Sequence, residues 1–480
     1  MLLRTLSALF LSVLLVVSAC RPERNYIHDS HARLEFNLDT VYFDTVFTET
    51  GTVTKSFRIK NPHKQFIEIS ELSLAGGEQS VFRINVDGRP GTKFEGLEIA
   101  PGDSMFVFVE ATLDLNNSPD IMRIQDSVVF LTNGNVQDID LVAWGQDVHL
   151  LFREHISSAT HTWTADKPYL IIDYLYVDSL STLKMEPGVH VHLHRDALIY
   201  VEGSLQVDGS LEEPVVFEGD RLEAFYENAP GQWGFIYLAG QSRNNRVTHS
   251  RVLNGTMGFL ISASPESGLM PDLDLSNTLI NQMSSHGIYA LNARIDARNL
   301  VVGDCGGSSL GLVYGGNYRF RHCTFANYWN SFYSNRQSPA VALTDYFVSN
   351  NADGDPVLHH GGQFERAEFL NSVICGNARM ELVIDSHTGQ QLEYRFDHCL
   401  TYINTDSMDY EDDPLFSHIL NNQNPRFDSL PWFGPDTLSP LIDAGLGAYA
   451  VGVAFDLEGK NRLADEAPDL GAVEWVEGER

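Results

Sequence analysis

Apolar and polar residues alternate along most of this chain in short runs, which Gly, Pro and Asn residues separate. The stretch Leu183–Trp233 illustrates the pattern, with alternating apolar positions in Val189–Leu193, Ile199–Val201 and Leu205–Val207. A period of two predicts β-strands, and strands this short fit a coil in which each turn pairs with the turn before it. Because no amphipathic run of helical length follows residue 20, we predict an all-β protein.

A longer periodicity runs from residue 247 to residue 400, where the pattern apolar-x-apolar-x-polar-x-apolar recurs. Its copies begin at Val247, Leu273, Ile295, Tyr318, Val341, Ala367 and Tyr394. The starts differ by 26, 22, 23, 23, 26 and 27 residues. A period in the twenties with one set of strands per repeat indicates a solenoid, and this length suits one turn of a three-sided parallel β-helix.

The fifth position of the repeat is polar throughout. It holds Arg251, Asn277, Asn299, His322, Asp345, Asn371 and His398. Stacked at about 4.8 Å per turn, these side chains would form a ladder along one corner of the coil, where Asn amides can bond along the stack. We predict a structural ladder that includes Asn277, Asn299, His322, Asp345, Asn371 and His398. A row of ligands for a glycan or a metal is the alternative.

Residues 34–148 contain short candidate strands separated by turn signals such as Asn61-Pro62, Gly76-Gly77 and Pro101-Gly102. The candidate strands are Leu34–Phe36, Val41–Val46, Val53–Asn61, Phe66–Leu72, Phe82–Val86, Met105–Leu113, Ser127–Leu131 and Ile139–Trp144. Seven or eight strands at this spacing predict an immunoglobulin-like β-sandwich.

Three runs in this region, Phe57–Asn61, Ile99–Ser104 and Ala143–Gly145, make it similar to the HYDIN/ASH-type immunoglobulin-like domains of bacterial envelope proteins. Members of that family mostly act as spacers or interaction modules. The resemblance therefore implies no catalysis by this domain.

The coil, residues 155–412, carries a second resemblance through Gly203–Leu205, Pro214–Phe217, Gly219–Arg221 and Gly231–Gly234. It resembles the right-handed parallel β-helix proteins of pectate-lyase-like fold found among Bacteroidetes lipoproteins. The predicted fold is therefore all-β, with an immunoglobulin-like β-sandwich followed by a right-handed parallel β-helix and a C-terminal cap.

Residues 413–480 resemble the closing segment of secreted β-helix proteins through Asp413–Phe416, Leu438–Gly445, Asp456–Arg462 and Pro468–Glu474. We expect them to form the final turns and a cap, because a solenoid needs cover over its last open turn. Trp432, Phe433, Val473 and Trp475 are the apolar residues that could provide this cover.

Residues 1–20 have the features of a lipoprotein signal peptide. Arg4 supplies the positive charge, and the apolar run Leu6–Val17 is shorter than the roughly 20 residues that span a bilayer. The end of this segment, Val17–Cys20, resembles a bacterial lipobox, which implies cleavage before Cys20 and attachment of lipid to it. An ordinary signal peptide ending in Cys is the alternative. We expect a lipid anchor on Cys20, a tether at residues 21–33 and a location in the cell envelope, at the outer membrane.

The formal net charge of −32 narrows the range of partners. Phosphate backbones require a basic surface, so a nucleic-acid partner is excluded. A polyanionic substrate is disfavoured for the same reason. A glycan that is neutral or weakly charged, or another envelope protein, remains as the partner.

Four cysteines follow Cys20, and none stands in a CxxC motif that would indicate a zinc or redox site. They are Cys305, Cys323, Cys375 and Cys399. The repeat register separates Cys323 from Cys399 by three turns, or about 14 Å, beyond the Cα separation of about 7 Å that a disulfide allows. We predict that these two residues do not pair.

Two kinds of metal site are weakly indicated. His190, His192 and His194 alternate along one strand, where an outward polar face is the simpler interpretation because residues i and i+4 lie about 13 Å apart. The run Asp409–Asp413 contains Asp409, Glu411, Asp412 and Asp413, whose carboxylates suit calcium, although a solvated loop explains them equally. We expect no other cofactor.

Function is the least determined property. Glu218, Asp220 and Glu223 cluster near Arg221 and could act as a glycosidase pair. No phosphate loop, GxSxG or HExxH motif is present, and fold alone does not define function. We therefore expect a non-catalytic module that binds glycan or protein, with a glycoside hydrolase or polysaccharide lyase as the alternative. Tyr314, Tyr328, Trp329 and Tyr333 are candidates to line a groove, or to stack in the core.

Overall fold

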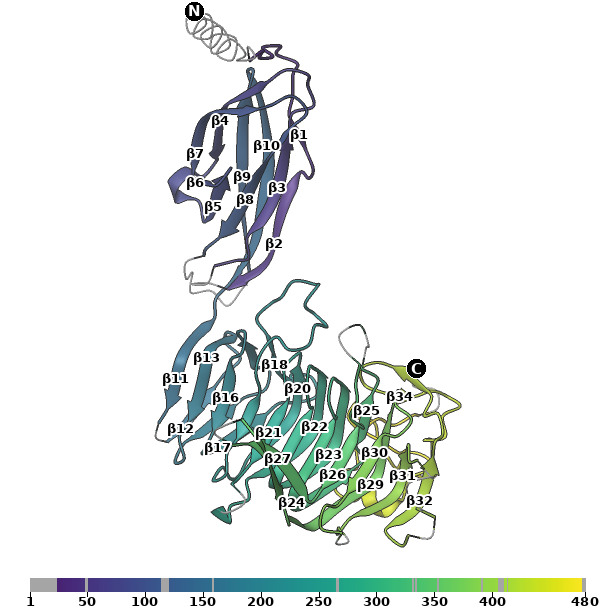
Figure 1. Ribbon diagram of the computed structural model, residues 1–480. Coiled ribbons are helices and arrows are strands. Elements are labelled where there is room, and N and C mark those ends of the chain that lie inside the picture. Colours follow the sequence, from purple (N-terminus) through teal and green to yellow (C-terminus); the bar gives the residue numbers. More distant parts are fainter. Residues whose placement is uncertain are drawn as a thin grey trace, which may run out of the picture. The chain divides into compact units, whose positions relative to one another are not determined.

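The computed structural model describes residues 24–47, 51–113, 121–157, 159–264, 267–329, 332, 335–351, 354–389, 392–404, 410–411 and 413–476. Its regular elements there are β-strands and two short 3₁₀ helices, η1 (Gly77–Gln79) and η3 (Gly447–Ala450). The chain divides into two compact units, Met1–Asp147 and Val148–Arg480 (Figure 1). The lipobox residue Cys20 lies outside the described residues. No helix in the described part of the chain has the length and apolar character needed to cross a bilayer.

The first unit is an immunoglobulin-like sandwich of two five-stranded sheets. One sheet has the order β1 (Glu35–Phe36), β3 (Lys55–Lys60), β8 (Ser104–Ala111), β5 (Phe82–Val86), β6 (Arg89–Gly91). The other has the order β2 (Thr40–Phe47), β10 (Asn135–Gln146), β9 (Met122–Thr132), β4 (Ile67–Leu74), β7 (Lys93–Ile99). Alternate side chains such as Phe57, Ile69 and Phe130 fill the core between the sheets. The sequence missed β6 and β7, because Arg89–Gly91 contains Pro90 and Gly96 interrupts the next run with a φ of 64°.

The second unit is a parallel β-helix, as predicted. Twenty strands form one continuous sheet in which each coil pairs in parallel with the next. The first ten are β11 (His149–Ile156), β12 (Thr160–Trp163), β13 (Tyr169–Val177), β14 (Thr182–Met185), β15 (His190–Leu193), β16 (Leu198–Val201), β17 (Ser204–Asp208), β18 (Val215–Gly219), β19 (Ile236–Leu238) and β20 (Arg246–Leu253). The others are β21 (Phe259–Ser262), β22 (Asp272–Met283), β23 (Ile288–Cys305), β24 (Leu310–Arg321), β25 (Thr324–Asn327), β26 (Val341–Thr344), β29 (Gln363–Gly376), β30 (Leu382–Asp385), β31 (Arg395–Thr401) and β32 (Phe416–Asn421).

The register of the repeat differs from the prediction at two places. Val247 pairs with Leu275 rather than with Leu273, a slip of two residues. Tyr318 pairs with Ala367, so the copy at Val341 does not belong to this series. The turn between these partners holds β26, which pairs with the start of β24, and an antiparallel hairpin of β27 (Tyr346–Asn350) and β28 (Pro356–His360). Since β26 alternates like the strands of the predicted series, the period alone could not show that it lies on another face of the coil.

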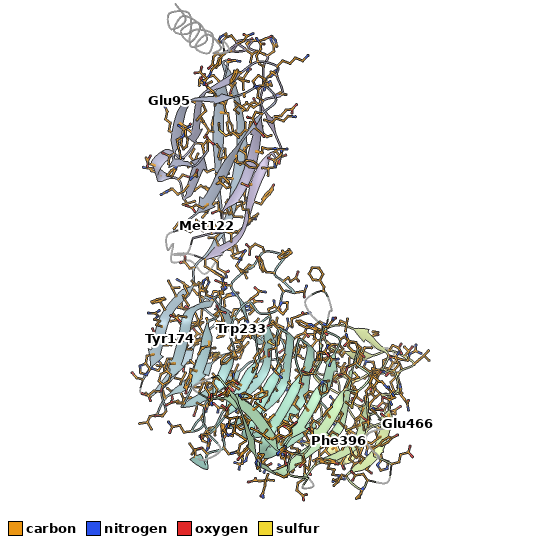
Figure 2. All side chains as sticks on the ribbon, in the orientation of Figure 1. Glu95, Met122, Tyr174, Trp233, Phe396 and Glu466 are labelled. Atoms are coloured by element: carbon orange, nitrogen blue, oxygen red, sulfur yellow. The ribbon has the colours of Figure 1, made fainter. Side chains whose placement is uncertain are left out.

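The interior of the coil is apolar and stacked along its axis. Phe320, Phe369, Phe396 and Phe416 lie one above the other, with ring centroids 4.9, 4.7 and 5.0 Å apart. Phe396 is labelled in Figure 2. Such stacks contribute about 0.5–1.5 kcal/mol per pair beyond the burial of apolar area. They also fix the register, because a shift of one residue would turn every ring outward.

The C-terminal segment, residues 422–476, runs along one side of the coil rather than over its last open turn. It includes β33 (Phe427–Ser429), β34 (Gly434–Pro435) and η3. The following residues of the segment and the coil form one buried cluster: Phe433, Leu441, Leu457, Leu470 and Val473 with Leu279, Val301, Val373 and Leu400. The last apolar position of the repeat therefore faces outward, and the C-terminal segment buries it. Among the residues predicted to provide cover, Phe433 and Val473 lie in this cluster, with 2% of each exposed.

Candidate functional site

A polar ladder occupies one corner of the coil. Its members are His249, Asn277, Asn299, His322, Asn371, His398 and His418, whose φ angles lie between 45° and 53°. The strand registers place each of them beside the next. Asn and His accept left-handed backbone more readily than most residues, which explains why these residue types stand at the corner. The Asn299 amide donates to Asn277 Oδ1 at 2.8 Å, and Asn371 Nδ2 lies 3.1 Å from His322 Nε2.

The predicted ladder was wrong in part. Asp345 is not a member, because it follows β26 on another face of the coil. There its carboxylate accepts hydrogen bonds from Ser386 Oγ, the His387 amide and Thr388 Oγ1. Burial raises the pKa of Asp345, but these bonds outweigh it and lower the pKa to about 2. Arg251 lies opposite Leu279, two residues beyond the ladder.

The C-terminal segment covers the middle of the ladder. The Leu446 amide donates to Asn371 Oδ1 at 2.9 Å, and Asn299 Nδ2 donates to the Phe455 carbonyl at 2.7 Å. His322 is fully buried, and burial lowers its pKa. Arg462 bridges Asn299 Oδ1 and the buried Glu474 carboxylate at 2.9 and 2.8 Å. The central ladder residues therefore hold the C-terminal segment in place, and His322 and Asn371 are fully buried beneath it.

The first end of the ladder opens into a groove. Three adjoining cavities of about 420, 290 and 290 Å³ lie between the coil and the C-terminal segment. The first two share Arg251 and Trp432, and the last two share His249 and Asn277. We call these three cavities the groove. Because Trp432 belongs to the C-terminal segment, the groove forms only where that segment runs back along the coil.

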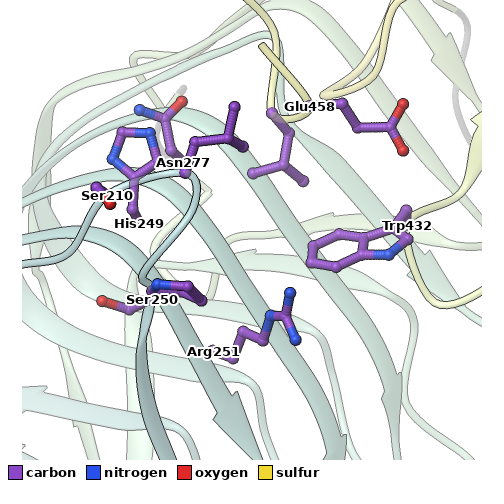
Figure 3. A pocket seen from close by; sticks show the side chains of 10 residues that line it. Ser210, His249, Ser250, Arg251, Asn277, Trp432 and Glu458 are labelled. Atoms are coloured by element: carbon purple, nitrogen blue, oxygen red, sulfur yellow. The ribbon is translucent and has the colours of Figure 1, made fainter. Parts of the chain in front are cut away.

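An arginine and a tryptophan define the centre of the groove. The Arg251 guanidinium carbon lies 5.2 Å from the Trp432 ring centroid. Figure 3 shows both side chains in the pocket that His249, Asn277 and Glu458 also line. Arg251 takes the place that apolar residues occupy in later coils, since it pairs with Leu279. In this coil an exposed cation beside an indole ring thus replaces the apolar residue found at the same position in later coils.

Amide side chains line the largest of the three cavities of the groove, and Tyr226, Glu218 and Glu227 also line it. Gln232 Nε2 donates to the Tyr226 and Ala229 carbonyls at 2.6 and 2.8 Å. The oxygens Gln232 Oε1 and Asn281 Oδ1 are buried and accept no hydrogen bond from the described residues. The first packs against Gly219 and the second against Gly303, and a buried acceptor without a donor costs about 1–3 kcal/mol.

Among the predicted acids, Glu218 lines the groove, whereas Asp220 and Glu223 are engaged elsewhere. Asp220 lies 2.6 Å from His194 Nδ1, and Glu223 forms two bonds with Arg221 at 3.0 and 2.8 Å. Burial raises the pKa of Glu218. Glu218 is therefore the one member of the predicted cluster with the environment of a general acid.

Of the three histidines expected on an outward polar face, His190 and His194 are exposed, whereas His192 in β15 is buried. His192 is 4% exposed, with Nδ1 3.3 Å from the Gly219 carbonyl and 3.6 Å from Glu218. Burial lowers its pKa to about 4, so the ring is neutral near pH 7. The chain that returns between β18 and β19 covers this face, where Gln232 packs against Gly219.

A second cluster lies at the other end of the ladder. Asp397 Oδ1 is 2.8 Å from His398 Nδ1 and 3.3 Å from His418 Nδ1. The Asp397 Oδ2 atom accepts hydrogen bonds from Tyr449 and Arg395, each at 2.5 Å. Burial raises the pKa of Asp397, and the bonds from Tyr449, His398 and His418 more than reverse this, lowering the pKa to about 2. The sequence indicated His398 only as a ladder residue and gave no signal for its partners.

The calcium candidates do not assemble in the described part of the chain. Asp409 and Asp412 lie outside the described residues. Glu411 is exposed, and Asp413 accepts hydrogen bonds from the Leu415 amide and the Tyr394 hydroxyl at 2.9 and 3.0 Å. Asp413 thus stabilises the turn into β32. Within the described residues, the group of His and acidic side chains with metal-binding spacing is Asp397, His398 and His418.

The four cysteines Cys305, Cys323, Cys375 and Cys399 are buried and unpaired. Burial raises the pKa of each thiol to about 12. Cys323 and Cys399 are two coils apart rather than three, because Tyr318 pairs directly with Ala367. Two steps are about 10 Å, which still exceeds the reach of a disulfide.

The aromatic residues expected at a groove lie elsewhere. Trp329 is buried, and Tyr328 stacks on Phe433 with ring centroids 6.1 Å apart. Tyr314 packs edge-on against Phe347, and Tyr333 lies outside the described residues. Trp432 and Tyr226 line the groove instead. Their positions depend on the C-terminal segment and on an inserted loop, which strand periodicity cannot locate.

No family model and no curated protein matches this chain. Among solved structures, the VesB protease of Vibrio cholerae is similar over 24% of this chain and 31% of its own, at 12% identity and a TM-score of 0.17. A human CEP192 ASH/PapD-like domain, PapD-like domain 7, is similar over 24% of this chain and 87% of its own, at 8% identity and a TM-score of 0.17. The chain thus spans under a third of VesB, and both likenesses are too distant to assign a function.

Proposed function

We propose that this chain is a lipid-anchored cell-envelope protein, of the kind found among Bacteroidetes lipoproteins, whose β-helix binds a glycan in the groove without cleaving it. The Arg251–Trp432 pair, in a groove lined by amide side chains, carries this proposal. Amide side chains donate and accept hydrogen bonds, so a ligand rich in hydroxyl groups suits this lining. A sugar has such groups at several positions.

The aromatic lining suits the same ligand. The Trp432 indole and the Tyr226 ring offer apolar faces among polar groups, which is the composition of small-molecule sites that fix orientation by a few polar contacts. Asn254 and Gln282 add further amide groups to the same cavity. The cavities adjoin one another, so the ligand is an oligosaccharide rather than a single sugar.

The charge of the protein restricts the sugar class. A net charge of −32 repels a polyanion, and Glu218, Glu227 and Glu458 line the groove itself. Arg251 provides one exposed cation at the centre. A neutral glycan, or one with isolated acidic groups, fits this balance best.

A glycan array with a chain of residues 21–480, followed by calorimetry on the best ligand, tests the proposal. Trp432→Ala and Asn281→Leu are each expected to weaken binding at least tenfold. Phe152→Ala is the matched control, because Phe152 is an exposed aromatic with Arg153 at 5.1 Å in the same unit but outside the groove. Unchanged affinity in Trp432→Ala would place the binding site elsewhere, and no binding on the array would contradict the proposal.

Glycan cleavage is the second candidate function, and the raised pKa of Glu218 favours it. A carboxyl group with a raised pKa holds its proton to higher pH and can donate it to a leaving glycosidic oxygen. Glu227 lines the same cavity. Incubation with the ligands from the array, followed by analysis of reducing ends, separates the two functions. Turnover that Glu218→Gln abolishes would establish an enzyme, whereas binding without turnover supports the module.

A further inference from the structure

The cluster at the far end of the ladder has the geometry of a metal site. Candidate ligand atoms of Asp397, His398 and His418 lie within 4.8 Å of one another. Ligands in a tetrahedral zinc site are about 3.3 Å apart, given bonds of about 2.0–2.1 Å. The separation of Asp397 Oδ1 from His418 Nδ1, 3.3 Å, equals that edge, and its separation from His398 Nδ1, 2.8 Å, is shorter by about 0.5 Å.

The backbone holds the two imidazoles in place. His398 and His418 occupy neighbouring coils, on β31 and β32, with φ angles of 51° and 53°. Their rings stack with centroids 4.1 Å apart and planes inclined by 23°. Because paired parallel strands fix both Cα positions, only small rotations of the rings are needed to direct both Nδ1 atoms at one ion.

The carboxylate is oriented by neighbours of its own. Tyr449 and Arg395 hold Asp397 Oδ2, which leaves Oδ1 directed at the imidazoles. Arg395 also donates to the Tyr449 hydroxyl at 3.0 Å. In metal sites, the side chains that bind the ion typically accept or donate such hydrogen bonds to neighbouring groups, which orient them and raise the affinity for the ion. Tyr449 comes from η3, so the C-terminal segment completes the site.

We propose that Asp397, His398 and His418 bind one divalent transition-metal ion, with Zn²⁺ as the reference, through Oδ1 and the two Nδ1 atoms. The His418 side chain is 65% exposed, so the ion has access and a water completes its coordination. Two imidazoles with one carboxylate favour Zn²⁺, Co²⁺, Ni²⁺ or Cu²⁺ over Ca²⁺ and Mg²⁺, which take oxygen ligands. In the bound state each imidazole carries its proton on Nε2. The site is independent of the groove and of the proposed function.

Metal titration of the purified, chelator-treated full chain tests the proposal. Native mass spectrometry is expected to show one tightly held Zn²⁺, and Co²⁺ is expected to give the visible absorption of a tetrahedral nitrogen–oxygen site. His418→Asn is expected to weaken Zn²⁺ binding at least tenfold and to abolish that absorption. Asn is suited to the left-handed corner, and His418 is largely exposed, so this variant keeps the fold.

His249→Asn is the matched control, because it changes the first histidine of the same ladder and has the same backbone conformation. It is expected to leave Zn²⁺ affinity unchanged. Excess Ca²⁺ is expected not to compete, which separates the site from the general attraction of cations to an acidic protein. Equal Zn²⁺ binding by His418→Asn and the unchanged chain, or the absence of a stoichiometric Zn²⁺, would overturn the proposal.

Discussion

Asn371 and Leu446 exchange two hydrogen bonds across 75 residues of sequence. The Leu446 amide donates to Asn371 Oδ1 at 2.9 Å, and Asn371 Nδ2 donates to the Leu446 carbonyl at 3.1 Å. One side chain thus completes a corner of the coil and pairs with the backbone of the C-terminal segment. A ladder that stabilises a solenoid along its axis here also fixes the segment that forms one wall of the groove.

Replacement of Asn371 by Ala is expected to lower the free energy of unfolding by about 3 kcal/mol. The change removes the hydrogen bonds of a buried amide and places a residue with a Cβ but no polar side-chain group at a φ of 49°. Chemical denaturation measures this change in the free energy of unfolding. Asn292→Ala is the control, with a φ of 51° and one amide bond, of 3.3 Å, and is expected to cost about 1 kcal/mol. Equal losses in the two variants would contradict a role for the contact with Leu446.

Loss of the buried Arg462–Glu474 pair is expected to be more damaging. Both side chains are fully buried and 2.8 Å apart, so Arg462→Met leaves a carboxylate without its cation and lowers stability by about 3–5 kcal/mol. Arg426→Met removes an exposed pair with Asp436 in the same segment and is expected to cost under about 1 kcal/mol. Adding Glu474→Gln to Arg462→Met should restore part of the loss. A double variant less stable than the single one would contradict this explanation.

Stability is expected to depend on pH through Asp304. Burial raises its pKa to about 6, against the hydrogen bond from the Tyr328 amide. An unfolded Asp has a pKa of about 3.9, so between these values the folded protein keeps a proton that the unfolded chain has lost. The free energy of unfolding therefore falls as the pH rises from about 4 to about 6.

Asp304→Asn removes this titration while keeping the acceptor and tolerating a φ of 47°. We expect the variant to be more stable than the unchanged chain by roughly 2 kcal/mol at pH 7.5, and nearly equal to it at pH 4. Urea unfolding at the two pH values measures the difference. Gln282→Asn, at the neighbouring position of the same corner with a φ of 59°, should show no such dependence on pH. A constant effect of Asp304→Asn across this range would exclude the mechanism.

The four buried thiols are expected to stay free and unreactive in the folded protein. Burial and a pKa of about 12 suppress the thiolate that reacts with thiol reagents. A chain of residues 21–480 should therefore show no reactive thiol when native and four in denaturant. Fewer than four in denaturant would reveal a disulfide and contradict the register that separates Cys323 from Cys399.

Much of the fold could be predicted because each coil of a β-helix repeats the same alternation of apolar and polar residues at a nearly constant spacing. Leu273, Ile295 and Tyr318 recur at the spacing of one coil, and their pairing follows that spacing. The prediction failed at Val341, because Val341 belongs to a coil strand on another face, paired with Leu310, and alternation does not show which face a strand lies on. It also missed His249, since an offset of two residues preserves every in-and-out assignment, and His418, which lies in the coil after the last predicted repeat.

The candidate sites were much less predictable. Glu218 was recognised as an acid near a turn, and His398 as a ladder residue, but neither had its partners assigned. Trp432 reaches Arg251, and Tyr449 reaches Asp397, only because the C-terminal segment runs back along the coil. Such contacts join residues far apart in the sequence, and no local periodicity records them.

The sequence by itself determined the all-β class, the sandwich followed by the coil, and the residue types at the ladder corner. It could do so because strand alternation, turn residues and left-handed corners are local properties of the chain. The tertiary structure alone decided the register, the path of the C-terminal segment, and therefore the groove and the Asp397–His398–His418 cluster. These follow from burial of the outward apolar stripe from Leu279 to Leu400, which requires a distant segment of the chain to cover it.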